Sequence, residues 1–198
     1  MSEGRRERAD AARNRRAILA ATEELLAVHR PQDISMEQVA AAAGVGKGTI
    51  FHRFGNRTGL MRALMVERAH ALQETVTSGP PPLGKGAPDR DRLLAFLDAI
   101  VEVVGRNKSL MAELAHSGQA PAEHSGDHPV YGFWHGHISA LINAERPDLD
   151  ADLIAHLLLG ALGSGPILNQ LTTDGPERLT ATMRSVARAL LDAPPEGI

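Results

Sequence analysis

The sequence contains no cysteine, which excludes disulfide bonds, thiolate metal sites and cysteine nucleophiles and favours a reducing compartment. It has only six aromatic residues among 198, so aromatic side chains give no indication of a ligand. No apolar run approaches the length of a membrane span, and the longest, residues 153–162, is interrupted by His156 and Gly160. The amino-terminal segment is rich in arginine and has no apolar signal core. We therefore expect a cytoplasmic protein without a membrane partner.

The charged residues are divided unevenly along the chain. The formal net charge of −3 argues by itself against a nucleic-acid-binding protein. Residues 1–70, however, hold twelve Lys or Arg against eight Asp or Glu, a net charge of +4, and residues 71–198 hold nine against sixteen, a net charge of −7. A basic amino-terminal part joined to an acidic remainder is typical of a DNA-binding head on a separate body.

Residues 35–57, SMEQVAAAAGVGKGTIFHRFGNR, predict two short helices joined by a tight turn. Ser35 and Gln38 have the spacing of a capping box, and Gly44 stands where the first helix must end. Ile50 and Phe54 lie one helical turn apart and predict the buried side of the second helix. This pattern is that of a helix-turn-helix, although a generic helical hairpin with a merely solvated polar face fits the same geometry.

Helical periodicity dominates the rest of the chain, and we find no segment with the pattern of a β-strand, so we predict an all-α fold. Residues 2–10 lack periodicity and predict a disordered, arginine-rich arm that could follow a DNA backbone or be simply solvated. Proline- and glycine-rich residues predict loops at 78–88 and 117–129. The segments expected to be helical are residues 11–29, 57–77, 89–105, 110–116, 130–145, 150–171 and 175–192.

The segment GVGKGTIFHRFGNRTGL closely resembles the signature of the TetR family of transcriptional regulators, and the preceding ISMEQVAAAAGV fits as well. The resemblance covers residues 13–64. It implies an all-helical homodimer in which three amino-terminal helices bind DNA and a larger helical part binds a small molecule and dimerises. The corresponding division is residues 1–56 for the arm and DNA-binding domain and residues 57–198 for the ligand-binding and dimerisation domain.

The resemblance also implies a set of DNA-contacting residues and an inverted-repeat operator in double-stranded DNA. Gly46 stands where the family usually has serine, so the second helix lacks a capping side chain, and Phe51 stands where tyrosine is frequent and lacks its hydroxyl. Both departures remove single contacts and leave the docking mode intact. The implied positions are Lys47, Gly48, Phe51, His52 and Arg53 on the recognition helix, with Ser35, Thr49 and Arg57 at phosphates.

The carboxy-terminal part offers candidates for a ligand pocket and a dimer interface. Taken singly, each pocket candidate is also an ordinary core residue, and the interface candidates could form only the core of the monomer. We favour dimerisation, because a single helix-turn-helix rarely supplies enough affinity alone. The ligand-binding candidates, which mix apolar and polar groups, are Phe96, Ile100, Met111, Phe133, Trp134 and His137. The dimer candidates on the last two helices are Leu158, Ala161, Leu162, Met183, Val186, Ala187 and Leu190.

Nine histidines make a helical metal-binding protein or enzyme the alternative hypothesis. Two Glu-x-x-His pairs, Glu67 with His70 and Glu113 with His116, match half of a di-iron bundle site, but such a site needs two further glutamates, and Glu102 is the only obvious donor. His135 and His137 are two residues apart and point to different sides of a helix. We expect no metal, no cofactor and no enzymatic activity. The sequence thus predicts a ligand-responsive regulator, most simply a repressor released from its operator by a small-molecule effector.

Overall fold

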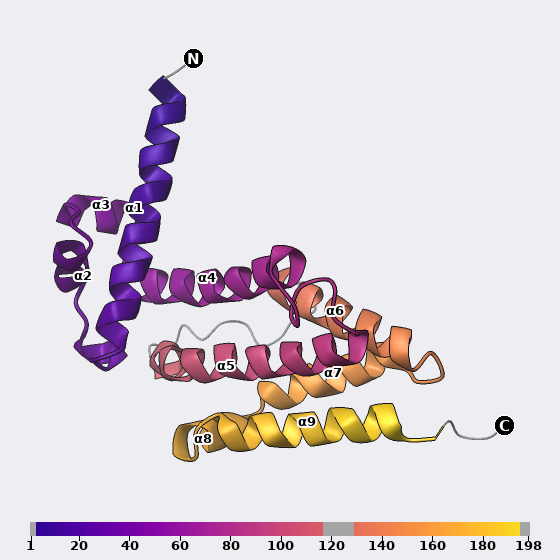
Figure 1. Ribbon diagram of the computed structural model, residues 1–198. Helices are drawn as coiled ribbons and strands as arrows, with labels where there is room; N and C mark the ends of the chain where they lie inside the picture. The colour runs from indigo at the N-terminus through magenta and orange to yellow at the C-terminus, as the bar shows by residue number, and fades with distance from the viewer. Residues whose placement is uncertain (1–2, 117–128, 195–198) are drawn as a thin grey trace. The chain divides into compact units, whose positions relative to one another are not determined.

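The structure is a computed structural model that describes residues 3–116 and 129–194 of the chain (Figure 1). Over these residues it consists of helices joined by short connections, with no β-strand, which confirms the predicted all-α fold. The elements are α1 (Glu3–Leu26), η1 (Pro31–Asp33), α2 (Met36–Ala42), α3 (Lys47–Phe54), α4 (Arg57–Ser78), α5 (Asp89–His116), α6 (Pro129–Glu145), α7 (Ala151–Leu162), α8 (Gly165–Thr173) and α9 (Glu177–Asp192).

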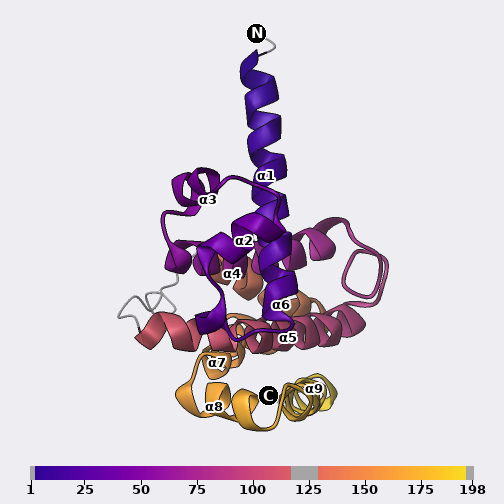
Figure 2. The ribbon, with the colours of Figure 1, turned by 90° about the vertical axis from the view of Figure 1, so that its left-hand side faces the viewer.

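The helices form two compact units, and α4 and α5 each contribute residues to both. The first unit holds the residues up to Glu67 together with the end of α5 from Ser109. In it α2 lies beside α1 and packs against α3 (Figure 2). Its core is built from α1, α2, α3 and the start of α4, and Leu110 of α5 is fully buried in the same cluster. Ile18 and Ile50 lie at the centre of this cluster without solvent exposure.

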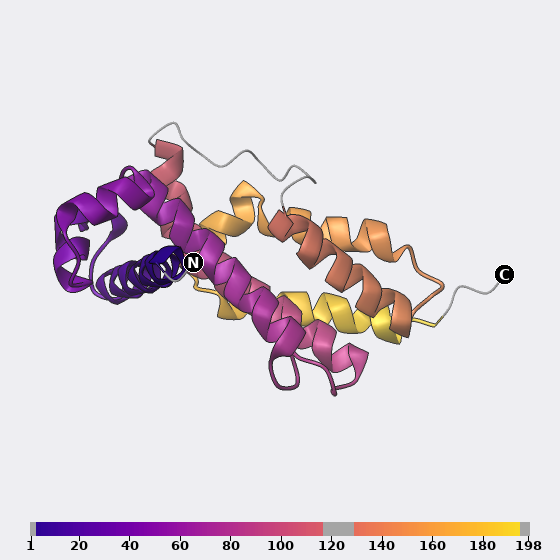
Figure 3. The same cartoon turned by 90° about the horizontal axis from the view of Figure 1, so that it is seen from above.

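The second unit has a larger core of its own, to which α5, α6, α7 and α9 contribute most of the side chains. Phe96, Leu97 and Ile100 on α5 are fully buried there, as is Ile138 on α6. Helices α6 and α7 lie side by side (Figure 3), as expected for two helices joined by a short connection. Arg146 in that connection binds Asp148 through two nitrogens and donates to the carbonyls of Leu190 and Ala193 at 2.7 and 2.6 Å, which ties it to the end of α9.

Three predictions about the helices were wrong. Helix α1 begins at Glu3 and not near residue 11, because residues 3–10 contain no proline and are rich in Glu and Arg, which favour helix. Helix α5 runs without a break through Gly105, where two helices were expected. The apolar segment 150–171 is instead two helices: α7 ends at Leu162, and α8 begins at Gly165. Pro166 lies in the first turn of α8, where proline is well accommodated.

The part of α5 that follows Gly105 is held by side-chain contacts. Its polar residues after Gly105 are held by contacts within the second unit: Asn107 accepts from Arg68 at 2.7 Å, and Lys108 donates to the carbonyl of Leu171.

The predicted loop at 117–129 lies outside the described residues except for Pro129, which begins α6. No single helix in the described ranges is long and apolar enough to cross a membrane; only α7 and α8 taken together, bent by 52°, reach that length and composition.

Candidate functional site

Helix α3 is fixed by the turn before it and by the two apolar side chains beneath it. Ser35 Oγ accepts from the Gln38 amide at 3.1 Å and Gln38 Oε1 accepts from the Ser35 amide at 2.8 Å, so the predicted capping box begins α2. Gly44 then has φ of 65°, a conformation that costs glycine little and other residues more. Ile50 and Phe54 are buried, so the opposite face of α3 is left to solvent. The expected geometry of the helical pair is therefore present.

The exposed face of α3 carries the five residues expected to enter a DNA groove. The Lys47 ammonium lies 2.5 Å from Glu37 Oε1 on α2 and 5.7 Å from the centre of the Phe51 ring. This pairing lowers the pKa of Glu37, chiefly through the hydrogen bond that Lys47 donates. A phosphate or base would have to compete with Glu37 for Lys47. The exposed residues of the face are Lys47, Gly48, Phe51, His52 and Arg53.

The three residues expected at phosphates already have structural roles or are less exposed. The Ser35 hydroxyl caps α2, and Thr49 is only partly exposed. Arg57 donates from Nη1 to the carbonyl of Pro31 at 2.7 Å, which ties the start of α4 to the segment before α2. Asn56 caps α4, since its Oδ1 accepts from the Gly59 amide at 2.9 Å. Contacts of these residues with phosphate stay a prediction.

The arginine-rich start of the chain is helical, and one of its arginines is part of the unit's packing. Arg15 lies 3.3 Å from Glu67 on α4, and its guanidinium is 5.7 Å from the centre of the Phe54 ring. Arg13 pairs with Asp10 on the same helix. The four-residue spacing of Arg15 from Leu19, on the buried side of α1, is the signal in the sequence that places its side chain there.

The pocket candidates on α5 and α6 are brought together in the core of the second unit. The His137 ring lies edge-on to Phe96, with centroids 4.7 Å apart, and stacks on Phe133 at 6.1 Å. Burial lowers the pKa of His137 from its ordinary value, and the charge of Arg92 adds to this. Among the described residues, the buried Nε1 of Trp134 and Nε2 of His137 have no hydrogen-bond partner. Ile100, one helical turn after Phe96 on α5, is also fully buried.

Met111 belongs to the first unit, unlike the other pocket candidates.

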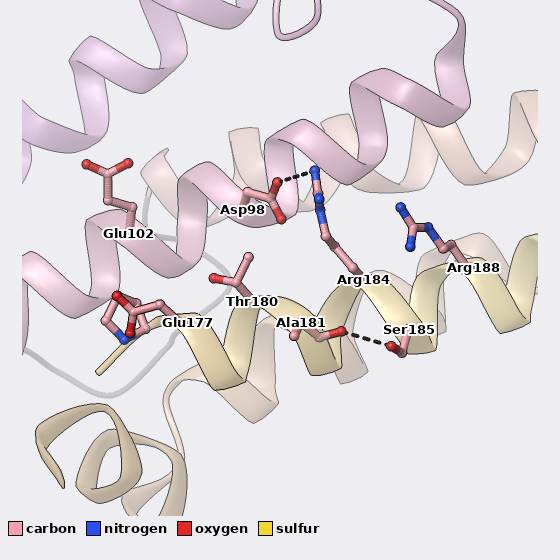
Figure 4. Close-up of a pocket in the computed structure, with 9 residues that line it drawn as sticks. Asp98, Glu102, Glu177, Thr180, Ala181, Arg184, Ser185 and Arg188 are labelled. Carbon is pink, nitrogen blue, oxygen red and sulfur yellow. Dashed lines mark hydrogen bonds and ion pairs between the residues drawn. The ribbon is translucent and has the colours of Figure 1, made fainter. Parts of the chain in front are cut away.

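The structure also contains a groove that the sequence did not indicate, with a volume of about 680 Å³ between α5 and α9 (Figure 4). Asp98 and Arg184 face each other across it at 2.8 Å. Burial raises the pKa of Asp98, and the attraction of Arg184 opposes that rise. The other charged groups along the groove are Glu102, Glu177 and Arg188.

The dimer candidates divide into buried and exposed residues. Ala161 and Val186 are exposed and Leu190 is partly exposed. The exposed leucines of α7, Leu153 and Leu157, are not among the residues that the sequence suggested. Their four-residue spacing to each other and to Ala161 could have shown that the three share a face. Four candidates instead pack into the core of the same chain: Leu158, Leu162, Met183 and Ala187.

The Glu-x-x-His pairs of the alternative hypothesis receive no support from the described side chains. Glu67 is occupied by Arg15, and the side chains of Glu113 and His116 lie outside the described part. The group that could hold a metal is a different one, His135, Asp152 and His156. The sequence could have indicated only part of this group: Asp152 and His156, four residues apart, lie on the same face of a helix.

The family model described as bacterial regulatory proteins, tetR family, matches residues 18–64, which hold the end of α1 and the helix-turn-helix. A segment of 96 residues, 48% of this chain, is 28% identical to the HTH-type transcriptional regulator SrpR of Pseudomonas putida. That segment spans 44% of SrpR, so this chain matches less than half the length of that relative.

Solved structures share the fold over nearly the whole chain. A putative TetR-family transcriptional regulator from Rhodococcus sp. superposes with a TM-score of 0.61 at 20% identity, covering 91% of this chain and 100% of that one. The transcriptional regulator FadR from Bacillus subtilis, solved in complex with stearoyl-CoA, gives a TM-score of 0.55 at 15% identity over 89% and 97% of the two chains. The segment 18–64, which contains the capped helix α2, the turn at Gly44 and helix α3, therefore carries the helix-turn-helix of the tetR family of bacterial regulatory proteins.

Proposed function

We propose that the protein is a cytoplasmic, ligand-responsive transcriptional regulator that binds an inverted-repeat operator as a homodimer and acts as a repressor. The observation that carries the proposal is the solvent-exposed face of α3, on which Lys47, His52 and Arg53 are held by the buried Ile50 and Phe54. A helix presented in this way suits the major groove of DNA, where Lys and Arg donate to guanine and to phosphate. The net charge of +4 on residues 1–70 favours the same partner.

The DNA flanking the protein's own gene is the substrate for the decisive experiment. Fluorescence anisotropy with this DNA should show tight binding that weakens steeply as salt rises, because Lys and Arg displace counterions from phosphates. The double variant Lys47→Ala, Arg53→Ala should bind at least tenfold more weakly. Its plot of log affinity against log salt should be shallower, by about 0.9 for each phosphate that the variant no longer neutralises. Unchanged affinity of this variant would show that α3 does not read the operator.

A matched control separates the recognition helix from net charge. Arg178 and Arg188 both lie on α9 in the second unit, and Arg178 is largely exposed. The double variant Arg178→Ala, Arg188→Ala removes the same charge as the α3 variant. It should retain most of the affinity for the operator, since the effect of long-range charge is weakened by salt. Equal losses of affinity in both variants would favour nonspecific electrostatic binding over recognition by α3.

The proposed effector site is the aromatic group around His137 in the second unit. The buried Trp134 Nε1 and His137 Nε2, which have no partner among the described residues, favour a small molecule with polar atoms on an apolar body. The fold that this chain shares with Bacillus subtilis FadR holds stearoyl-CoA in that protein, which supports a small-molecule role for the second unit. The effector would release the operator by binding the conformation that does not bind DNA more tightly.

A further inference from the structure

Three potential metal ligands converge on one side of the α6–α7 pair in the second unit. His135 comes from α6, and Asp152 and His156 come from successive turns of α7. One ligand atom from each of the three lies within 4.8 Å of the other two. His135 is partly buried, whereas Asp152 and His156 are exposed, so an ion from solution can reach the group. None of these residues takes part in the proposed recognition of DNA or effector.

The distances within the group are close to those of a tetrahedral metal site. Nε2 of His135 lies 3.5 Å from Asp152 Oδ1, and Nε2 of His156 lies 3.9 Å from Asp152 Oδ2. Ligands bonded to zinc at about 2.0 Å in a tetrahedron are themselves about 3.3 Å apart. Nε2 of His135 also lies 3.1 Å from the backbone carbonyl of Asp152, to which it would donate in the metal-free protein. Binding of an ion would replace that contact and its proton, and small side-chain adjustments would then place both imidazole nitrogens and the carboxylate around the ion.

A neighbouring hydroxyl can accept from His156 in the tautomer that coordination needs. The Tyr131 hydroxyl lies 2.6 Å from Nδ1 of His156, on the far side of the ring from Asp152. If Nδ1 carries the proton and donates to Tyr131, the lone pair of Nε2 is directed toward Asp152. The Tyr131 ring also stacks on His135 and on His156, with centroids 6.1 and 5.8 Å away. Such an outer partner orients a ligating histidine in many metal sites.

The backbone beneath the group is held in place from two sides. Asp150 caps α7 by accepting from the Leu153 amide at 3.0 Å, which fixes the turn that carries Asp152. Ser139 of α6 donates to the carbonyl of Ala151 at 3.1 Å and joins the two helices next to the group. Ligands held on packed helices lose less freedom on binding than ligands on loops.

From these contacts we infer that His135, Asp152 and His156 form a site for a divalent transition metal ion, Zn²⁺ being the best match. Two neutral imidazoles and one carboxylate form a nitrogen and oxygen set that suits Zn²⁺ better than Ca²⁺ or Mg²⁺, which prefer oxygen ligands. Three protein ligands leave the fourth position to water. The two imidazole rings lie close together, with centroids 4.0 Å apart, beside a single carboxylate. A bound dication would attract a nitrogen lone pair of each ring. The bound ion joins α6 to α7.

The test is a titration of the full chain, stripped with EDTA, with Zn²⁺ followed by calorimetry and with Co²⁺ followed by visible absorption. Wild-type protein should bind one ion at this site and give the intense visible bands of four-coordinate cobalt. His135→Ala with His156→Ala, and separately Asp152→Asn, should weaken this binding at least a hundredfold and remove the bands. Because the Asp152 side chain is 75% exposed, Asp152→Asn leaves the fold intact and keeps the test valid if the double variant unfolds.

The control removes two imidazoles elsewhere. His29→Ala with His70→Ala changes two exposed histidines and should leave both titrations as in wild type. Tyr131→Phe should lower the Zn²⁺ affinity by about ten- to hundredfold while leaving the metal-free protein equally stable, as expected of a positioning residue. The inference is overturned if Asp152→Asn and the His135, His156 double variant bind Zn²⁺ and Co²⁺ as wild type does, which would place the ion at other histidines. Absence of binding to wild-type protein overturns it as well.

Discussion

Lys47 on α3 is paired with Glu37 on the preceding helix α2, Nζ to Oε1 at 2.5 Å. Both side chains are exposed, so the pair faces the solvent that DNA would replace. A carboxylate at this position repels phosphate and occupies the ammonium that would bind it. If this face binds DNA as proposed, we expect Glu37 to limit the affinity, because a contact made by Lys47 must first replace this ion pair.

Removing the Glu37 charge should strengthen binding to DNA. Glu37→Gln frees Lys47 and removes one negative charge from the face proposed to bind DNA, and the strength of exposed ion pairs suggests a gain of about two- to fivefold at low salt. The gain should shrink as salt is raised, because screening weakens the charge in both proteins. Anisotropy titrations at two salt concentrations measure it. Glu24→Gln, which removes an exposed carboxylate of α1, is the control, and an equal gain there would argue against a specific role for the pair.

Two neighbouring glycines should respond in opposite directions to serine. Gly46 caps α3 with φ of −67° and ψ of 145°, and a Cβ added there meets only Thr49 Oγ1, at 3.8 Å. Gly46→Ser should therefore raise the stability of the protein by about 0.5 kcal/mol, through a capping hydrogen bond and a less flexible unfolded chain. Gly44→Ser should lower it by about 1 kcal/mol, because φ is 65° there. Urea unfolding measures both, and stabilisation by Gly44→Ser would contradict the assigned turn.

Local patterns explain why the helix-turn-helix could be predicted so closely. The Ser35–Gln38 capping box, the turn at Gly44 and the Asn56 cap each depend on residues within four positions of one another. Short-range rules of this kind can be applied to the sequence without knowledge of the fold. The same rules failed for α1 and α5, where the absence of proline allowed helix to continue past the expected ends.

The features that the sequence did not reveal depend on contacts between distant residues. Leu110 lies in the core of the first unit although the earlier residues of its own helix, α5, build the second, and no local pattern indicates this change. The burial of Leu158 and Met183 against the exposure of Leu157 and Val186 depends on how α7 and α9 pack. His135 joins Asp152 and His156 only because α6 and α7 lie side by side. Periodicity marks an apolar face, but tertiary packing decides what covers it.

The exposed leucines of α7 predict how the proposed homodimer can be broken. Leu157 is 65% exposed in the single chain, so Leu157→Glu should cost little in folding stability yet place a charge in an apolar interface. We expect the variant to sediment as a monomer at concentrations where wild-type protein sediments as a dimer, and to bind the operator at least tenfold more weakly. Val28→Glu is the control, since Val28 is 74% exposed in the first unit and lies outside the proposed interface. A dimeric Leu157→Glu variant would move the interface away from this face.

His137 should make the stability of the protein depend on pH in the weakly acidic range. Burial lowers its pKa in the folded protein below the ordinary 6.5, with a further contribution from Arg92 that Asp89 opposes. Between the folded and unfolded pKa the unfolded chain binds more protons, so stability falls as pH drops below about 6.5 and is fully retained above it. His137→Phe should reduce this fall, measured as the difference in urea midpoint between pH 7.5 and pH 5.0. Phe133→Leu alters the same cluster without removing a titrating group and should keep the full difference; if His137→Phe keeps it too, other groups cause the acid sensitivity.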